Sequence, residues 1–367
     1  MKTSEPSPLS PFLPCGLATG IGSLPFTEPV EALAMIRKYL PAVPHWPQLP
    51  RRGSAENFVF QFLRPLVDTA LLTVTKGGAY FDTAHPAWPD RLTELYSLYF
   101  AAEEGNRDAL EKFALPKSSA PGFFAFLKDM RRTGLHGIKC VKGHMVGPLT
   151  AGFQLKDECG RLAYYQDQLR DIIVKTLAMH ARWQAAALSS LGLPVLLFVD
   201  DPCVGACGSC YHLTLTNEMI LEDLNTIFSA VHKENAMAGV HSCDAADWSL
   251  LFEADLEIVS LDVYRFGDSL LCHAAQLANF LKRGGIVAWG IVPTLDGAFE
   301  ESAGSLLERL RTLWLKLIQC GVDRERLRDR SLITPACGMG LLSPELTEKI
   351  YRLTGEVSAF TARYSFP

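Results

Sequence analysis

The sequence predicts an α/β fold of the (β/α)8 TIM-barrel class, built as one domain. Two observations lead to this prediction: short apolar runs of strand type recur along the chain, and amphipathic stretches of helical spacing lie between most of them. A third observation is that residues able to bind metals or act in catalysis follow directly after the apolar runs. Barrel enzymes carry their active groups at the carboxyl ends of the strands. The competing fold, an open doubly wound sheet, would place a ligand at one switch point instead.

The predicted strands share a run of buried-type residues that ends in Gly, Pro, Asp, His or Cys. Seven of them lie at residues 17–21, 139–146, 194–199, 236–240, 257–261, 286–292 and 331–336. The eighth is the weakest and is expected near Ala42–Leu49, before a long helical insertion from Glu56 to Leu135. Helices between later strands are expected at Arg161–Ser190, Thr216–Asn235, Ser269–Arg283 and Glu300–Cys320.

The domain organisation is simple, because no internal repeat and no low-complexity linker divides the 367 residues. Residues 1–14 contain four prolines and are predicted to form a flexible N-terminal arm. Residues 15–367 are predicted to form the barrel, which is the catalytic domain.

Composition excludes several classes of partner. The net charge is −5 and no Lys/Arg-rich run stands out, which disfavours a nucleic-acid partner. No run approaches the roughly 18 apolar residues of a membrane span, and the N-terminus lacks the apolar stretch of a secretory signal. We therefore expect a cytoplasmic protein whose ten cysteines are reduced and serve as metal ligands, nucleophiles or core residues.

His241-Ser242-Cys243 ends one predicted strand and places two metal-ligand types two residues apart, on the same side of an extended chain. Such a pair alone is more often ordinary packing, since free Cys is among the most buried residue types. Two further positions at strand ends change the balance. Cys337 is the expected third ligand, and Asp262 is expected either to ligate the metal or to support a ligand. Zinc favours these donors, and catalytic zinc keeps three protein ligands and an open position.

These stretches resemble a known family. His241-Ser-Cys243, Val-Ser-Leu-Asp262, Val-Asp200-Asp201-Pro202 and Pro335-Ala-Cys337-Gly338 are similar to the catalytic half of cobalamin-independent methionine synthase, within the superfamily that includes uroporphyrinogen decarboxylase. Thr19-Gly-Ile-Gly-Ser23-Leu-Pro25 resembles the family's first strand, and Lys142-Gly-His-Met-Val-Gly-Pro148-Leu-Thr150 its third. The matches follow one order over residues 17–345.

The resemblance implies a zinc-dependent methyltransferase that activates homocysteine and yields methionine. Carried over by position, it implies zinc ligands at His241, Cys243 and Cys337, with Asp262 where the methionine synthases have Glu. It also implies that Asp200 binds the substrate amino group and that the Ile21-Gly22-Ser23 backbone holds the carboxylate; Glu56 is a second candidate for the amino group. The family's duplicated N-terminal barrel has no counterpart here, so the expected methyl donor is either methyltetrahydrofolate or a methyl-corrinoid protein.

Several alternatives stay open at the level of sequence. A methyltransferase for a thiol that is not an amino acid, a uroporphyrinogen-decarboxylase-like enzyme and a non-catalytic zinc- or corrinoid-binding protein all suit the same fold. Cys203, Cys207 and Cys210 have the C-x3-C-x2-C spacing of radical enzymes with an iron–sulfur cluster, but they follow a mid-chain strand and lack the usual aromatic residue before the last Cys. A Gly-rich loop is the favoured interpretation of that stretch.

Overall fold

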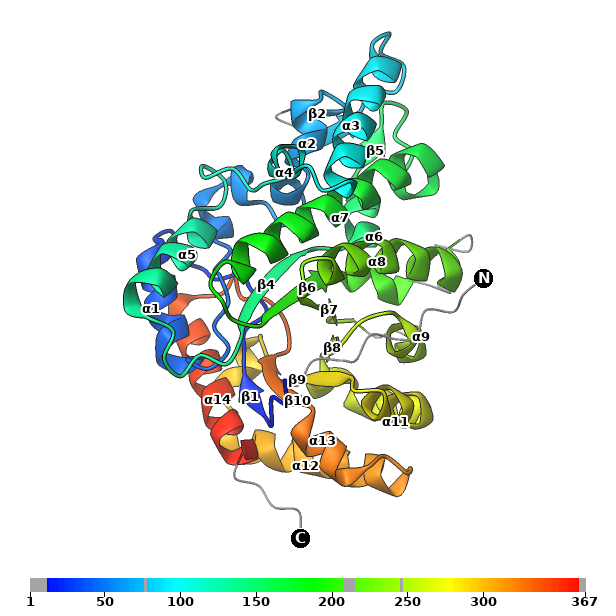
Figure 1. The fold of residues 1–367 in the computed structure, drawn as a ribbon. Coiled ribbons are helices and arrows are strands. Elements are labelled where there is room, and N and C mark those ends of the chain that lie inside the picture. The colour runs from blue at the N-terminus through cyan, green and yellow to red at the C-terminus, as the bar shows by residue number, and fades with distance from the viewer. Residues whose placement is uncertain (1–11, 76–77, 207–214, 245–246, 363–367) are drawn as a thin grey trace.

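The computed structural model describes residues 12–75, 78–206, 215–244 and 247–362. A mostly parallel α/β architecture, with helices packed around a curled sheet of seven parallel strands, dominates the described part (Figure 1). The strand order is β1-β10-β9-β8-β7-β6-β4. The bounds are β1 Leu17–Ala18, β4 Val141–Val146, β6 Val195–Asp200, β7 Met237–Ser242, β8 Ile258–Leu261, β9 Ile286–Val292 and β10 Ser331–Pro335.

The helices that cover the outside of this sheet follow the strands in sequence. They are α1 Pro29–Tyr39, α6 Pro148–Gln154, α7 Asp167–Ser189, α8 Asn217–His232, α9 Trp248–Glu253, α10 Val263–Phe266, α11 Ala274–Lys282, α12 Ala303–Gln319, α13 Arg324–Asp329 and α14 Pro344–Ala362. The predicted helices at Arg161–Ser190, Thr216–Asn235, Ser269–Arg283 and Glu300–Cys320 correspond to α7, α8, α11 and α12, so their existence is confirmed while their ends shift by a few residues.

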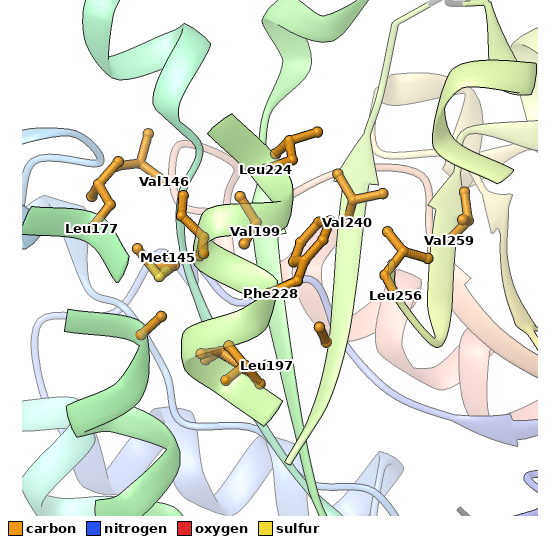
Figure 2. Packing of buried hydrophobic residues seen from close by; sticks show 14 of the residues in the cluster. Met145, Val146, Leu177, Leu197, Val199, Leu224, Phe228, Val240, Leu256 and Val259 are labelled. Atoms are coloured by element: carbon orange, nitrogen blue, oxygen red, sulfur yellow. The ribbon is translucent and has the colours of Figure 1, made fainter. Parts of the chain in front are cut away.

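Two separate hydrophobic clusters show that the sheet curls around a core of its own. Alternate residues of the strands, such as Leu196 and Phe198 on β6, form a small cluster on the inner side. The intervening residues face the helices, and Figure 2 shows Leu197 and Val199 of β6 in the same buried cluster as Leu224 and Phe228 of α8. Strands buried on both faces explain why the sequence runs are continuously apolar rather than alternating.

The segment Ala42–Leu49 lies between the two edges of the sheet. The amide of Lys142 on β4 donates to Pro44 O (2.9 Å), and on the other side the amide of Leu24 donates to Gln48 O (2.9 Å). The predicted eighth strand is therefore not a regular strand but two isolated parallel bridges, at His45 and Gln48. The prolines at positions 44 and 47 within the segment, and those at 41 and 50 that flank it, lack the backbone donors that a continuous ladder requires.

The insertion between this segment and β4 is only partly helical, so the prediction of one long helical segment at Glu56–Leu135 was wrong in part. It contains α2 Arg64–Asp68, α3 Trp88–Glu103, α4 Arg107–Glu111 and α5 Pro121–Thr133. It also contains an antiparallel pair, β2 Leu72–Thr75 and β3 Gly78–Phe81, which β5 Lys156–Asp157 extends in parallel. The β-branched residues Thr73, Val74 and Thr75 favour a strand over a helix. Among the described helices, none is long and apolar enough to cross a membrane.

Candidate metal centre

Three side chains converge at the carboxyl ends of two strands. His241 lies near the end of β7, Cys243 follows that strand, and Cys337 follows β10. One nitrogen of His241 and the two sulfurs all lie within 4.8 Å of one another. Residues i and i+2 of an extended chain point to the same side, which is why both His241 and Cys243 reach the same point.

The orientation of His241 leaves one ring nitrogen free. Its Nδ1 lies 3.0 Å from Oγ of Ser260 on the neighbouring strand β8. Its Nε2 is buried and has no hydrogen-bond partner among the described residues. Buried polar atoms normally have a partner, and a buried imidazole nitrogen without one is suited to bind a metal ion.

The thiols of Cys243 and Cys337 influence each other's pKa. A hydrogen bond from Cys243 lowers the pKa of the Cys337 thiol despite its burial, and the nearby charge of His241 acts in the same direction. The same bond to Cys337, together with burial, raises the pKa of Cys243. An imidazole nitrogen and two sulfurs are the donor set that suits zinc.

Asp262 lies beside this cluster, and its carboxylate is directed elsewhere. It caps the short helix α10: Oδ1 accepts from the amide of Arg265 (3.0 Å), and Oδ2 lies 2.6 Å from the Arg265 Nε. The group that comes together within 4.8 Å consists of His241, Cys243 and Cys337, without Asp262.

Asp200 ends β6 directly opposite His241 in the strand register. Its side chain is buried, and Oδ1 has no hydrogen-bond partner among the described residues. Burial raises the pKa of Asp200 to about 6, although the charges of Lys142 and His241 act in the opposite direction. A buried carboxylate oxygen without a donor is suited to accept a hydrogen bond from a bound cationic group.

The segment Ile21–Ser23 is attached to the loop that carries Cys337. Ser23 O accepts from the amide of Met339 (3.0 Å), and Ser23 Oγ accepts from the amide of Gly340 (3.2 Å). Gly22 packs on the ring of His144, so closely that a Cβ at position 22 would lie 2.6 Å from it. This close approach requires glycine.

Glu56 lies in a short 3-10 helix, Ser54–Glu56, beyond the end of the proline-rich segment. Its Oε2 accepts from the amide of Leu49 (3.0 Å), and Oε1 lies 2.7 Å from Arg52 Nε. Burial raises the pKa of Glu56 to about 7. These contacts join Glu56 to its own loop, and none of them joins it to the three candidate ligands.

Two polar residues of β4 belong to the interior but were not singled out as site residues from the sequence. Lys142 is fully buried; its Nζ donates to Ile21 O (2.5 Å) and lies 4.3 Å from the centre of the Phe198 ring. Burial lowers the pKa of Lys142 to about 8, while Asp200 acts to raise it. His144 stacks on Trp46 with ring centres 4.0 Å apart. The signal in the sequence was a lysine inside an otherwise buried strand, which is rare without a partner.

The cysteine motif at Cys203, Cys207 and Cys210 lies only partly within the described residues. Cys203 is half-buried in the 3-10 helix Pro202–Ala206, and burial raises the pKa of its thiol. Cys207 and Cys210 lie outside the described residues.

Comparisons with known proteins assign no family. No family model matches the chain, and no curated protein sequence matches it. Among solved structures, a B12-independent methionine synthase from Shewanella sp. W3-18-1 in complex with selenomethionine is 17% identical, covers 66% of this chain and 67% of that chain, and has a TM-score of 0.47. An endo-β-1,4-mannanase double mutant from Cellulomonas fimi is 13% identical over 65% of this chain and 58% of that chain, with a TM-score of 0.35. A GH113 β-mannanase from Alicyclobacillus acidocaldarius is 10% identical over 66% of this chain and 76% of that chain, with a TM-score of 0.34.

Proposed function

We propose that this chain is a zinc-dependent methyltransferase that methylates the thiol of an amino acid, with homocysteine as the substrate and methionine as the product. The observation that carries the proposal is the convergence of His241, Cys243 and Cys337, whose ligand atoms lie within 4.8 Å of one another. The resemblance of their surrounding stretches to cobalamin-independent methionine synthase supplies the reaction class.

The fold that accompanies this proposal is a (β/α)8 barrel formed by residues 15–367 as one cytoplasmic catalytic domain. The seven parallel strands and the proline-rich segment Ala42–Leu49, bonded to β4 on one side and to Leu24 on the other, support it. In such a barrel the three ligands stand at the carboxyl rim, where barrel enzymes hold their substrates.

His241, Cys243 and Cys337 would hold the metal. Ser260 fixes the ring of His241 through Nδ1 and leaves Nε2 for coordination. Zinc bound there would hold the incoming thiol as a thiolate at neutral pH and so make it nucleophilic. The thiol sulfur then forms a bond to the methyl carbon as the bond between that carbon and the donor breaks.

Asp200 and the Ile21–Ser23 backbone would orient the amino acid. The Asp200 Oδ1, buried and without a partner, accepts a hydrogen bond from the substrate ammonium. Lys142 supports both groups, because its Nζ donates to Ile21 O and its positive charge favours the ionised form of Asp200. Glu56 is a second candidate for the ammonium.

The experiment is to measure bound zinc and methyl transfer to homocysteine with two donors in parallel, methyltetrahydrofolate and methylcobalamin. We expect one zinc per chain, and the donor that supports turnover identifies the methyl source. Cys337→Ser should lower zinc affinity at least about tenfold and abolish turnover, since replacing even a supporting residue typically costs that much.

The matched control is Cys320→Ser, which changes an exposed cysteine at the end of α12 and should leave zinc and turnover unchanged. A zinc-free protein that is fully active, or a zinc protein that binds donors tightly without turnover on any thiol, would overturn the proposal.

A further inference from the structure

Asp262 occupies the position at which a carboxylate ligand is expected, yet both of its oxygens are already engaged. Oδ1 accepts from the Arg265 amide at 3.0 Å, and Oδ2 pairs with the Arg265 Nε at 2.6 Å. The carboxylate is 1% exposed, so solvent offers it little else. An aspartate is also one methylene shorter than a glutamate, which limits how far its carboxylate can extend from β8.

Arg265 connects Asp262 to the backbone that carries a metal ligand. Its Nη2 donates to the carbonyl of Cys243 at 2.9 Å, while its Nε holds Asp262. The guanidinium also lies 5.0 Å from the centre of the Phe266 ring. One side chain therefore ties the end of β8 to the loop after β7, and it does so through the carboxylate that would otherwise be free to coordinate.

Breaking this ion pair would leave the buried carboxylate of Asp262 without its partner, although the Arg265 side chain is itself half exposed. Asp262 is buried and Arg265 is its cationic partner, so withdrawing the carboxylate from Arg265 forfeits a charge-assisted hydrogen bond and the helix cap. Coordination by Asp262 would have to offset both. His241, Cys243 and Cys337 carry no such competing ion pair in the described part of the chain.

We propose that Arg265 withholds Asp262 from the metal, so that the metal has three protein ligands and a fourth position open to an exogenous thiol. The inference rests on the proposed function and sharpens it. The substrate thiol would enter the open position as a thiolate, releasing its proton to water, without displacing a protein carboxylate. Arg265 is thus a positioning residue: it contacts neither the metal nor the substrate and acts through Asp262.

The test follows the coordination sphere rather than activity. The full chain is loaded with Co²⁺ for absorption spectroscopy and with Zn²⁺ for X-ray absorption, with and without homocysteine. Wild-type protein should show two sulfurs per metal, and three with homocysteine. Asp262→Asn should leave the spectra unchanged, because asparagine is an equally good helix cap and no ligand is lost.

Arg265→Met should release Asp262 to the metal. We expect an added oxygen ligand, an altered cobalt spectrum and homocysteine binding at least about tenfold weaker, because the thiol must now displace a carboxylate. The double variant Arg265→Met/Asp262→Asn should restore the wild-type spectrum and affinity, which a merely structural role of Arg265 would not produce. Arg309→Met is the matched control, since Arg309 contacts α10 through Tyr264 O and not Asp262.

The outcomes separate the two proposals. A changed spectrum in Asp262→Asn alone, or a wild-type spectrum in Arg265→Met, overturns the role of Arg265 and leaves the metal site standing. Failure of the wild-type chain to bind either metal overturns the proposed function, and this inference with it. Asp262→Asn keeps the test decisive even if Arg265→Met does not fold.

Discussion

The Oγ of Ser260, 3.0 Å from His241 Nδ1, controls which nitrogen of the imidazole faces the cysteines. With Nδ1 carrying the proton and donating to Ser260, Nε2 presents a lone pair to the metal. We expect Ser260→Ala to lower zinc affinity by about 10- to 100-fold, because groups that orient a ligating histidine have effects of this size. Competition with a chromophoric chelator measures it.

Ser242→Ala is the matched control for Ser260→Ala. Ser242 lies between His241 and Cys243, is equally buried, and its hydroxyl has no hydrogen-bond partner among the described residues. Ser242→Ala should therefore leave zinc affinity within about threefold of wild type, since no interaction of the hydroxyl is lost. Equal losses in the two variants would contradict the role given to Ser260.

Helix α7 carries a buried histidine, His180, whose hydrogen bonds require the neutral form of its ring. His180 Nδ1 lies 3.0 Å from Phe113 O, and His180 Nε2 lies 3.2 Å from Nε2 of the Gln184 side chain. Gln184 in turn bonds Trp46 Nε1 through its Oε1 (2.8 Å). One nitrogen of His180 donates and the other accepts, which only the neutral ring can do.

Burial lowers the pKa of His180 from 6.5 to about 4, which predicts a pH dependence of stability. Between these values the unfolded chain binds a proton that the folded chain does not, so stability falls as pH decreases from 6.5 towards 4. Relative to His180→Gln, wild type should lose about 2 kcal/mol of unfolding free energy between pH 7 and pH 5. Urea denaturation at the two pH values measures the difference.

His232 on α8 gives a comparison of opposite sign. Burial acts to lower its pKa, but the hydrogen bond and charge of Glu257 raise the pKa of His232 above 6.5 overall. Its contribution is therefore present at low pH and is lost as pH rises through the folded value. Finding that His180→Gln and His232→Gln shift the pH profile in the same direction would contradict these assignments.

The proline-rich segment Ala42–Leu49 lies between β1 and β4, the two edge strands of the seven-stranded sheet. Its amides at Trp46 and Gln48 donate to Lys142 O (3.3 Å) and Gly22 O (3.2 Å). If these bonds close the sheet, both amides should exchange with deuterium as slowly as those of β6, because they open only when the whole sheet opens. Native-state hydrogen exchange resolved by residue measures this.

Gly53 serves as the reference for a local turn, since its amide donates to Pro50 O (3.3 Å) at an exposed site. It should exchange faster than Trp46 and Gln48 by several orders of magnitude. Exchange of all three amides at similar rates would mean that the segment opens independently and that the sheet is not closed by it.

Apolar runs bounded by breakers were sufficient to predict the seven strands and the parallel α/β class, because burial on both faces leaves a strong local signal. The strand-end positions of His241, Cys243 and Cys337 followed from the same runs. The proline-rich segment and the β2–β3 pair were less predictable, since their backbone bonds go to partners distant in sequence or compete with helical periodicity.

The orientation of each polar side chain was decided only in three dimensions. Asp262 follows β8 and Asp200 ends β6; the sequence offers Asp262 a local partner in Arg265, three residues further along the chain, and offers Asp200 none that near. In the folded chain Asp262 meets Arg265 and caps α10, whereas Asp200 Oδ1 has no donor among the described residues. The position of a residue at a strand end follows from the local periodicity of the sequence. The surroundings of a buried charge such as Asp200 depend on which elements the fold brings beside it.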